Sequence, residues 1–437
     1  MKKLIYAIVL LLCGAVSEVS AQEFKLSAEI RPRSELRNGF KKLRTDSQEP
    51  AFFTEQRSRL NLDYKSEKII MRLSLQDVRV WGSTNQIYKT DPNSLSNISE
   101  AWAQYNFNSK FGLKVGRQIL SYDNQRFLGG LEWAQQGRRH DAALFVYNNK
   151  ESKLKVHLGL AFNQVGFEPG MLVGNDYTGV NNYKTMQYIW ANKTWESGKL
   201  SALVFNDGFQ YGATSDSVSN RQTLGLVGAK TFGNLTVAGE GYYQTGKMAT
   251  ASINAYLLDL NLTLKTKLTP ITLGYQTLSG GDPDSGEIKN FTPAYGTNHK
   301  FNGFMDYFYV GNAHNDKKGN NVGLQDIYLN TAFKVGKGKF KAQVHQFFSA
   351  VDMYNTTATD GQFEKVSSNL GTEIDLIYAR ALGKDASLVV GYSQMFATES
   401  MEVLKGGNSG MINNWAFVML TFKPTLFTSK VKQAEAK

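Results

Sequence analysis

Hydrophobic and polar residues alternate along almost the whole chain, from Phe24 to Phe422. In residues 154–163, LKVHLGLAFN, every second residue from Leu154 onward is apolar, and Lys155 and His157 lie between them. Because successive side chains of a β-strand point to opposite faces, this pattern predicts strands with one apolar and one polar face. No helical period and no proline-rich linker interrupts the series, so we expect one all-β domain.

The alternating segments predict eighteen strands, near residues 24–37, 53–65, 69–81, 98–107, 111–121, 137–148, 154–163, 184–194, 200–212, 219–232, 235–246, 253–266, 271–279, 320–334, 340–352, 365–382, 386–397 and 411–422. Turns after even-numbered strands are short, whereas most connections after odd-numbered strands are long. This predicts an 18-stranded antiparallel transmembrane β-barrel with short periplasmic turns and long extracellular loops. Aromatic residues beside the short turns fit a membrane-interface girdle: Tyr64, Phe107, Phe111, Tyr147, Trp195, Phe232, Phe333 and Phe340. A large soluble β-protein is the alternative, but it gives no reason for alternating loop lengths.

We interpret the start of the chain as a cleaved export signal. Lys2 and Lys3 precede an apolar run, and Val19-Ser20-Ala21 provides the small residues of a cleavage site. We therefore expect a signal peptide over 1–21, a barrel over 22–422 in the cell outer membrane, and a basic tail over 423–437.

The chain is basic, and loss of Lys2, Lys3 and Glu18 with the signal lowers its net charge only from +11 to +10. A basic exported protein favours an anionic neighbour, which here is a membrane surface, an acidic polymer or an anionic solute. Nucleic acid is not expected as a partner of an exported chain.

Arginines concentrate in the first third of the chain, where 12 of the 14 lie between Arg31 and Arg139. An arginine on the lipid-facing side of a barrel costs about 2–4 kcal/mol at the midplane, so arginines on polar faces should point into the lumen. Alternation assigns this orientation to Arg31, Arg33, Arg37, Arg57, Arg59 and Arg72.

Arg79 and Arg117 share the parity of apolar neighbours. They face the lumen only if a bulge near Gln76-Asp77, or a kink at Gly116, shifts the register. On the next strand we expect Arg139 and Asp141 to form an inward pair, and Arg138 stays ambiguous.

Acidic residues on polar faces occur on later strands: Glu240, Asp259, Asp326, Glu373 and Asp375. A cationic wall opposite a partly anionic wall would create a field that attracts anions. The alternative is that pairs such as Arg33 and Glu55 only brace the barrel and neutralise each other.

Several longer stretches resemble the alginate export family of outer-membrane barrels: QDVRVWG (76–82), VGRQILSYDNQRFLGGLEW (115–133), GRRHDAALFVY (137–147), HKFNGFMDYFY (299–309), LGTEIDL (370–376) and VGYSQMF (390–396). The resemblance implies an 18-stranded, arginine-lined conduit that passes an acidic polysaccharide by diffusion. At positions that match the family's motifs, the resemblance implies that the residues lining the conduit are Arg79, Arg117, Arg126, Arg138 and Asp141. The characterised exporter of that family has a long periplasmic gating loop near the end of its barrel, whereas the corresponding turn here is only Gly383-Lys384-Asp385. The longest connection in this chain, 280–319, is our candidate for a loop that folds inward and constricts the channel.

The sequence thus predicts a channel for an alginate-like polysaccharide or another anionic solute, with outer-membrane lipid as its surroundings. A general, weakly selective porin is the alternative, and an outer-membrane enzyme is a third reading. We expect neither enzymatic activity nor a cofactor. No histidine lies in a sequence motif with a catalytic serine, and none has the spacing of a metal-ligand site. The solute, the direction of transport, the oligomeric state and any periplasmic partner stay open.

Overall fold

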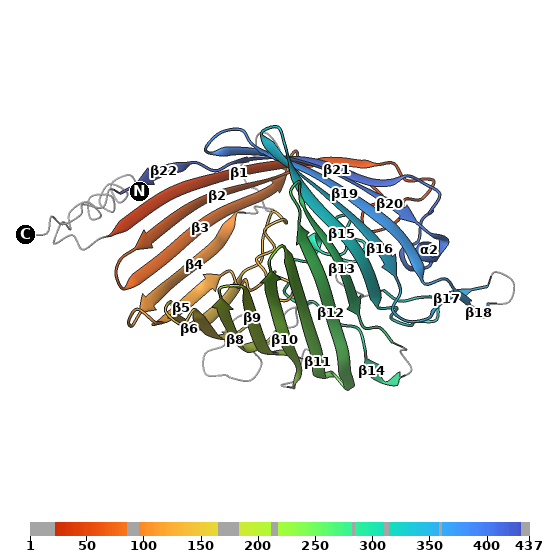
Figure 1. The fold of residues 1–437 in the computed structure, drawn as a ribbon, viewed down its shortest axis with the longest axis horizontal. Coiled ribbons are helices and arrows are strands. Elements are labelled where there is room, and N and C mark those ends of the chain that lie inside the picture. The colour runs from red at the N-terminus through yellow and green to blue at the C-terminus, as the bar shows by residue number, and fades with distance from the viewer. Residues whose placement is uncertain are drawn as a thin grey trace, which may run out of the picture.

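The computed structural model describes residues 22–84, 96–164, 183–210, 217–281, 285–309, 314–357 and 361–429, so the expected signal peptide lies outside the described residues. Eighteen strands of this described part form the barrel (Figure 1). They are β1 (Glu23–Asn38), β2 (Ala51–Lys65), β3 (Ile69–Val80), β4 (Asn97–Asn106), β5 (Phe111–Gln118), β6 (His140–Asn149), β7 (Leu154–Phe162), β8 (Thr185–Trp195), β9 (Gly198–Gln210), β10 (Val218–Phe232), β11 (Leu235–Met248), β12 (Ala251–Lys265), β13 (Pro270–Leu278), β15 (Leu324–Val335), β16 (Gly338–Phe348), β19 (Asn369–Ala381), β20 (Ala386–Ala397) and β21 (Asn413–Phe422).

Each barrel strand pairs antiparallel with the next, and the last pairs with the first. In that closing pair, β21 meets β1 from Ile30 to Asn38, with Arg37 opposite Trp415. The ring therefore has no free edge along this pairing, and its backbone groups can be satisfied within a membrane. The predicted 18-stranded antiparallel barrel is confirmed.

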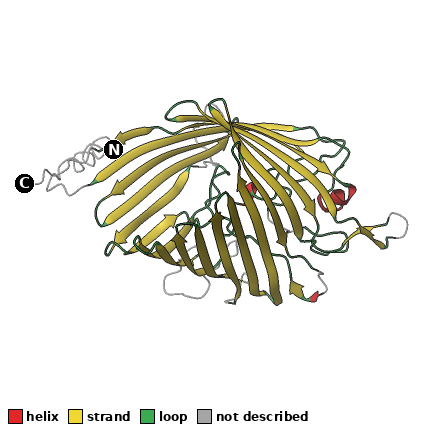
Figure 2. Ribbon diagram, in the orientation of Figure 1, coloured by secondary structure: helices red, strands yellow, loops and turns green. Residues whose placement is uncertain are grey.

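The remaining elements are short and are not among the eighteen strands of the ring (Figure 2). They are the strands β14 (Glu287–Ile288), β17 (Met353–Thr356), β18 (Phe363–Val366) and β22 (Thr425–Thr428), the 3-10 turn η2 (Asn298–Lys300) and the helix α2 (Glu399–Lys405). In the described part of the chain, no helix is long and apolar enough to cross a bilayer. Part of the segment expected as a basic tail thus forms β22, which pairs with β1 over Lys25–Ser27.

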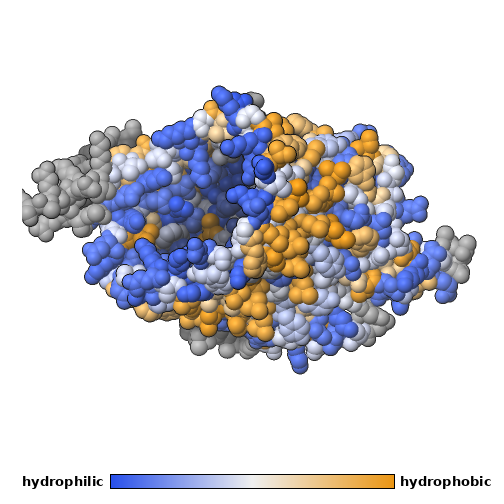
Figure 3. Space-filling model, viewed as in Figure 1, coloured by the Kyte–Doolittle hydropathy of each residue, from blue (hydrophilic) through white to orange (hydrophobic). Residues whose placement is uncertain are grey.

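The two faces of the wall differ as the alternation predicts. On β12, Leu258 and Leu260 are more than half exposed on the outside, whereas Asp259 between them points inward and is 9% exposed. Figure 3 shows a band of hydrophobic residues over the strands to the right of centre and a hollow bordered by hydrophilic residues to the left. The apolar surface is thus turned outward, and the polar side chains line the interior.

The buried apolar residues lie inside the barrel, where two long connections fold against the wall. Phe127 and Tyr295 come from these connections and contact Phe205 of β9 at centroid distances of 5.0 and 5.7 Å. Aromatic rings bury a large apolar area, so this core stabilises the connections in the interior.

Candidate functional site

The lumen is crossed by two connections. We name residues 119–139, between β5 and β6, the first inner loop, and residues 289–309, between β13 and β15, the second inner loop. The first reaches β1 through Arg31, which donates to the Glu132 carbonyl, and reaches β9 through Asp123, which accepts from Ser201. Since β1 and β9 are far apart around the ring, this loop must traverse the interior.

The second inner loop spans a similar arc. The Tyr295 hydroxyl donates to Asp207 of β9 at 2.7 Å, and the Met305 amide donates to Glu373 of β19 at 2.7 Å. The structure thus places residues 289–309 of the predicted 280–319 segment inside the barrel.

The two inner loops also pair with each other. Leu128 and Tyr295 form a parallel bridge, and the Gly129 amide donates to the Tyr295 carbonyl at 2.8 Å. The Arg138 guanidinium donates to the Gly296 carbonyl at 2.7 Å. The loops therefore form one connected layer across the lumen.

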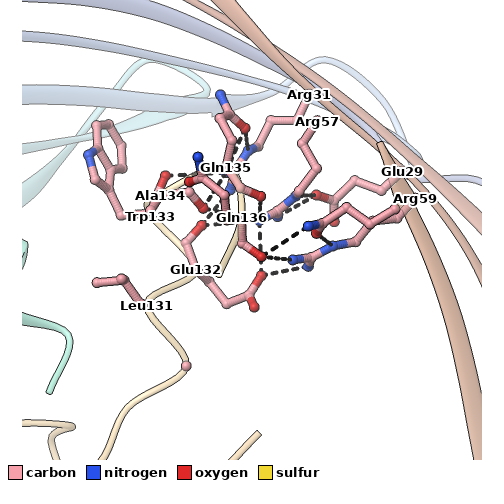
Figure 4. Close-up of polar contacts among 12 residues, drawn as sticks. Glu29, Arg31, Arg57, Arg59, Leu131, Glu132, Trp133, Ala134, Gln135 and Gln136 are labelled. Atoms are coloured by element: carbon pink, nitrogen blue, oxygen red, sulfur yellow. Dashed lines mark hydrogen bonds and ion pairs between the residues drawn. The ribbon is translucent and has the colours of Figure 1, made fainter. Parts of the chain in front are cut away.

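One side of this layer is held by the arginine wall, which we define as Arg31, Arg33, Arg57 and Arg59 of β1 and β2. Arg31 and Arg33 each donate at 2.7 Å to a loop carbonyl, of Glu132 and of Trp133 respectively. Figure 4 shows Arg31, Arg57 and Arg59 converging from the strands on residues 132–136. Planar guanidinium groups with several fixed donors suit this task, because one side chain can bond several carbonyls.

Glu132 is the acidic centre of these contacts. Its carboxylate lies 2.7 Å from Arg59, 2.8 Å from Arg139 and 3.1 Å from Arg57. Burial alone would raise the pKa of Glu132, but the charges of Arg59, Arg139 and Arg57 together lower that pKa to about 2. Glu132 is therefore ionised at neutral pH and fastens the first inner loop to the wall.

The other side of the layer is held by the carboxylate wall, which we define as Glu240, Asp326, Glu373 and Asp375. Each of these inward carboxylates accepts a hydrogen bond from an inner loop. The donors are Arg126 to Glu240 at 3.2 Å, Asn302 to Asp326 at 3.0 Å, and the amides of Met305 to Glu373 at 2.7 Å and of Phe304 to Asp375 at 3.4 Å. These four acidic residues of the later strands thus face the interior, and both walls bind loops.

An aromatic contact joins both loops to the arginine wall. The Trp133 ring stacks on His299 at 4.5 Å with an interplanar angle of 11°, and the Arg33 guanidinium lies 4.2 Å from the Trp133 ring centre. His299 in turn bonds Asp306 at 2.7 Å. Cation–π and stacking contacts thus link both inner loops to Arg33 of β1.

Three further predicted residues face the lumen, and within the described part of the chain they bond wall residues rather than the inner loops. Arg37 bonds Glu35 and lies over Phe40 and Phe53. Arg72 forms a bidentate pair with Asp63, at 2.6 and 3.1 Å, and stays about a third exposed. Asp259 accepts from Tyr328 and Gln276.

Arg79 lies on the outer face, which corrects the lumen assignment. The pairing of β2 with β3 runs without a shift through Gln76 and Asp77, so Arg79 stays opposite the outward Gln56. The register shift occurs instead between β3 and β4, at Ser74 and Leu75. Arg79 pairs with Asp77 at 2.6 Å on that outer face.

Arg117 and Asp141 also face outward, so the expected inward pair of Arg139 and Asp141 is wrong. Gly116 has a φ of +114°, but the kink leaves the alternation intact. Asp141 pairs with Arg117 at 2.7 Å. Arg139 precedes β6 and belongs to the first inner loop, where it pairs with Glu132.

The sequence reasoning missed two parts of the lumen. The path of the first inner loop was not predicted. Lysines that share the inward parity near the short turns were also not predicted, because only arginines were assigned to the cationic lining. These inward lysines are Lys25, Lys114, Lys155, Lys199, Lys265, Lys334, Lys339 and Lys341. In the described part of the chain, none of them forms an ion pair with a carboxylate. The alternation itself, as in Lys155 next to Val156, was the signal that could have found them.

The chemistry of the lumen is that of charged and aromatic side chains. Within the described ranges, no group of three or more His, Cys, Asp or Glu residues is placed to hold a metal ion. His345 lies between Asp326 and Gln343, at 2.9 and 3.1 Å, as one more link of the buried polar network.

Comparison with solved structures gives outer-membrane barrels. Acinetobacter baumannii OccAB4 matches with a TM-score of 0.60 and 12% identity over 93% of this chain and 98% of that chain. Pseudomonas aeruginosa OccK9 (OpdG) and OpdK with vanillate match with TM-scores of 0.57 and 0.54 at 10% identity, each over 92% of this chain and 98% of the other. At this identity the likeness concerns the fold.

Sequence comparison supplies the family. A search of curated proteins gave no match. Residues 22–410 match the family described as Alginate export, whose members are transport channels rather than enzymes. This chain, a closed β-barrel of the outer membrane, therefore belongs to the Alginate export family.

Proposed function

We propose that this protein is an outer-membrane channel through which an anionic solute diffuses, either an acidic polysaccharide of the alginate type or a smaller carboxylate. The observation that carries the proposal is the balance of charge inside the barrel. Wall arginines are matched by Glu29, Glu35, Glu55 and Glu132, whereas the inward lysines near the short turns have no ion-pair partner among the described residues. The short-turn end of the lumen thus keeps an excess of positive charge that attracts anions.

The inner loops bear on the size of the solute. They cross the lumen as one layer, so a polymer would have to thread through the remaining space as a single extended chain. The family description supports a polysaccharide, and the solved OpdK structure with vanillate offers a small carboxylate as the other size class. A weakly selective general porin remains the second candidate, because an 18-stranded barrel leaves an aqueous channel whatever the charge of its lining.

The reversal potential of single channels in a salt gradient tests the proposal. We expect a clear anion preference, and a reversal potential near zero would favour the general porin. Blockade of the current by uronate polymers but not by neutral glycans would favour the polysaccharide over a small carboxylate.

Strand β3 offers a matched pair of variants for this measurement. Arg72 and Arg79 each pair with an aspartate at 2.6 Å, but they lie on opposite faces of the wall. We expect Arg72→Gln to lower the anion preference and Arg79→Gln to leave the preference unchanged. Equal effects of the two variants would contradict a selectivity set inside the lumen.

A further inference from the structure

Three lysines gather on the inner face of β15 and β16 beside a short turn. We name Lys334, Lys339 and Lys341 the lysine cluster. Lys334 is the direct cross-strand partner of Lys339, and Lys341 lies two residues further along β16. The turn that joins the two strands lies at the rim expected to face the periplasm.

The position of Lys341 shows that the cluster faces the lumen. Its ammonium nitrogen lies 5.2 Å from the ring centre of Phe304, which belongs to the second inner loop. Lys339 and Lys341 also share the parity of Gln343 and His345, both buried inside the barrel. Lys334 shares its face with Lys339 because directly opposite residues of an antiparallel pair point the same way.

The fold leaves this positive charge uncompensated. Like charges directly opposite each other on one face of a sheet are destabilising. Among the described residues, no carboxylate lies within ion-pair distance of the three lysines. Asp375, whose charge acts on Lys341, is buried and accepts hydrogen bonds from Ser393 and Phe304. The arginine wall differs, because its guanidinium groups bind glutamates and loop carbonyls.

We propose that the lysine cluster is a capture site, at the short-turn mouth of the lumen, for a ligand that carries two or more carboxylates. This inference rests on the proposed function and adds to it the place of capture and the charge number of the solute. Cross-strand partners lie about 4.5–5.5 Å apart at their Cα atoms, so two ammonium groups can meet neighbouring carboxylates of one molecule. A monocarboxylate brings a single negative charge, so it neutralises only one of the two ammonium groups.

Lysine suits capture that must stay reversible. Its ammonium is a compact charge on a flexible stem, without the fork that holds a carboxylate bidentately. Exposed ion pairs of this kind are individually weak, so the ligand gains affinity from several contacts and can leave them one by one. The site therefore discriminates by the number of charges on the ligand.

The test is current blockade in planar bilayers with the full mature chain and the variant Lys334→Gln/Lys339→Gln. Channel orientation is fixed by streptavidin on a biotinylated cysteine at Ser47, in the exposed loop before β2, since the only native cysteine is Cys13. The probes are tetragalacturonate, galacturonate and neutral maltotetraose. We expect the variant to raise the half-blocking concentration of tetragalacturonate roughly tenfold from the short-turn side, and to change that of galacturonate much less.

Lys230→Gln is the matched control. Lys230 lies beside a short turn of β10, but its parity is that of the outward Leu224 and Leu226 and it contacts the Phe232 ring. We expect wild-type blockade from this variant. Heat-modifiable mobility in gels shows that each variant has kept its barrel.

Each result decides between the two proposals. Anion-selective channels whose short-turn blockade is the same with and without the two lysines would overturn the capture site and leave the channel function intact. Wild-type channels with no anion preference and no blockade by either uronate would overturn the proposed function and the capture site together.

Discussion

Individual charged residues in this lumen serve the architecture first. The ion pair on which the bracing alternative depends is present between Arg33 and Glu55, which lie 3.0 Å apart. Arg33 also binds the Trp133 carbonyl, so the same guanidinium holds a loop. The alternation of polar and apolar residues could predict that these side chains point inward. It could not predict which of them donate hydrogen bonds to loop carbonyls.

The first prediction concerns Glu132, which joins Arg57, Arg59 and Arg139. In Glu132→Gln these guanidinium groups lose their shared anion, and we expect about 1 kcal/mol less local stability, a looser first inner loop and higher single-channel conductance. Conductance of single channels in planar bilayers measures the effect. Glu151→Gln, at an exposed short turn, is the control and should behave as wild type.

The same residue gives a pH dependence with a definite sign. The pKa of Glu132 falls from 4.5 to about 2 in the folded chain, so its contribution is complete above about pH 4.5 and is lost as the pH falls toward 2. Conductance should therefore stay level from pH 7 to about pH 5 and rise below that value. An identical acid-induced rise in Glu132→Gln would contradict this assignment.

At the level of elements, the strands could be predicted from the sequence, whereas the inner loops could not. Alternation located all eighteen barrel strands, because a strand buried on one side and facing polar space on the other must repeat every two residues. Residues 119–139 carry no such period, and their path depends on partners as distant in sequence as Glu240 and Tyr295. Irregular backbone that lies against another irregular segment leaves no local signature in the sequence.

The second prediction removes the first inner loop. Gln118 and His140 are direct cross-strand partners, so an Asn-Gly turn in place of 119–139 should join β5 to β6 as a tight hairpin. We expect single-channel conductance to rise about twofold or more, because an 18-stranded barrel without inner loops leaves a wide aqueous channel.

The control for this deletion shortens a loop outside the lumen. Residues 46–49 are exposed and precede β2, and their replacement by Gly-Gly should leave the conductance unchanged. A loop-deleted channel with wild-type conductance would show that the first inner loop does not restrict the current.

For the whole molecule, closure of the ring decides whether the barrel exists. The wall is sealed by β21 against β1, and β22 adds only the pairing over Lys25–Ser27. The third prediction compares two truncations. A chain that ends after Phe422 keeps all eighteen strands and should show the heat-modifiable mobility of a folded barrel in gels, whereas a chain that ends after Gly410 lacks β21 and should not. Equal mobility of the two truncations would contradict the observed closure.

Uneven strand length has a consequence for the surrounding lipid. Strand β5 has 8 residues and its neighbours β4, β6 and β7 have 10, 10 and 9, whereas β1 has 16. At about 3.4 Å per residue and a tilt near 45°, eight residues rise only about 19 Å, less than the usual apolar height of about 25 Å. We therefore expect acyl chains beside β5 to shorten or splay, so that the bilayer thins there and its head groups reach the outward Arg117 and Asp141.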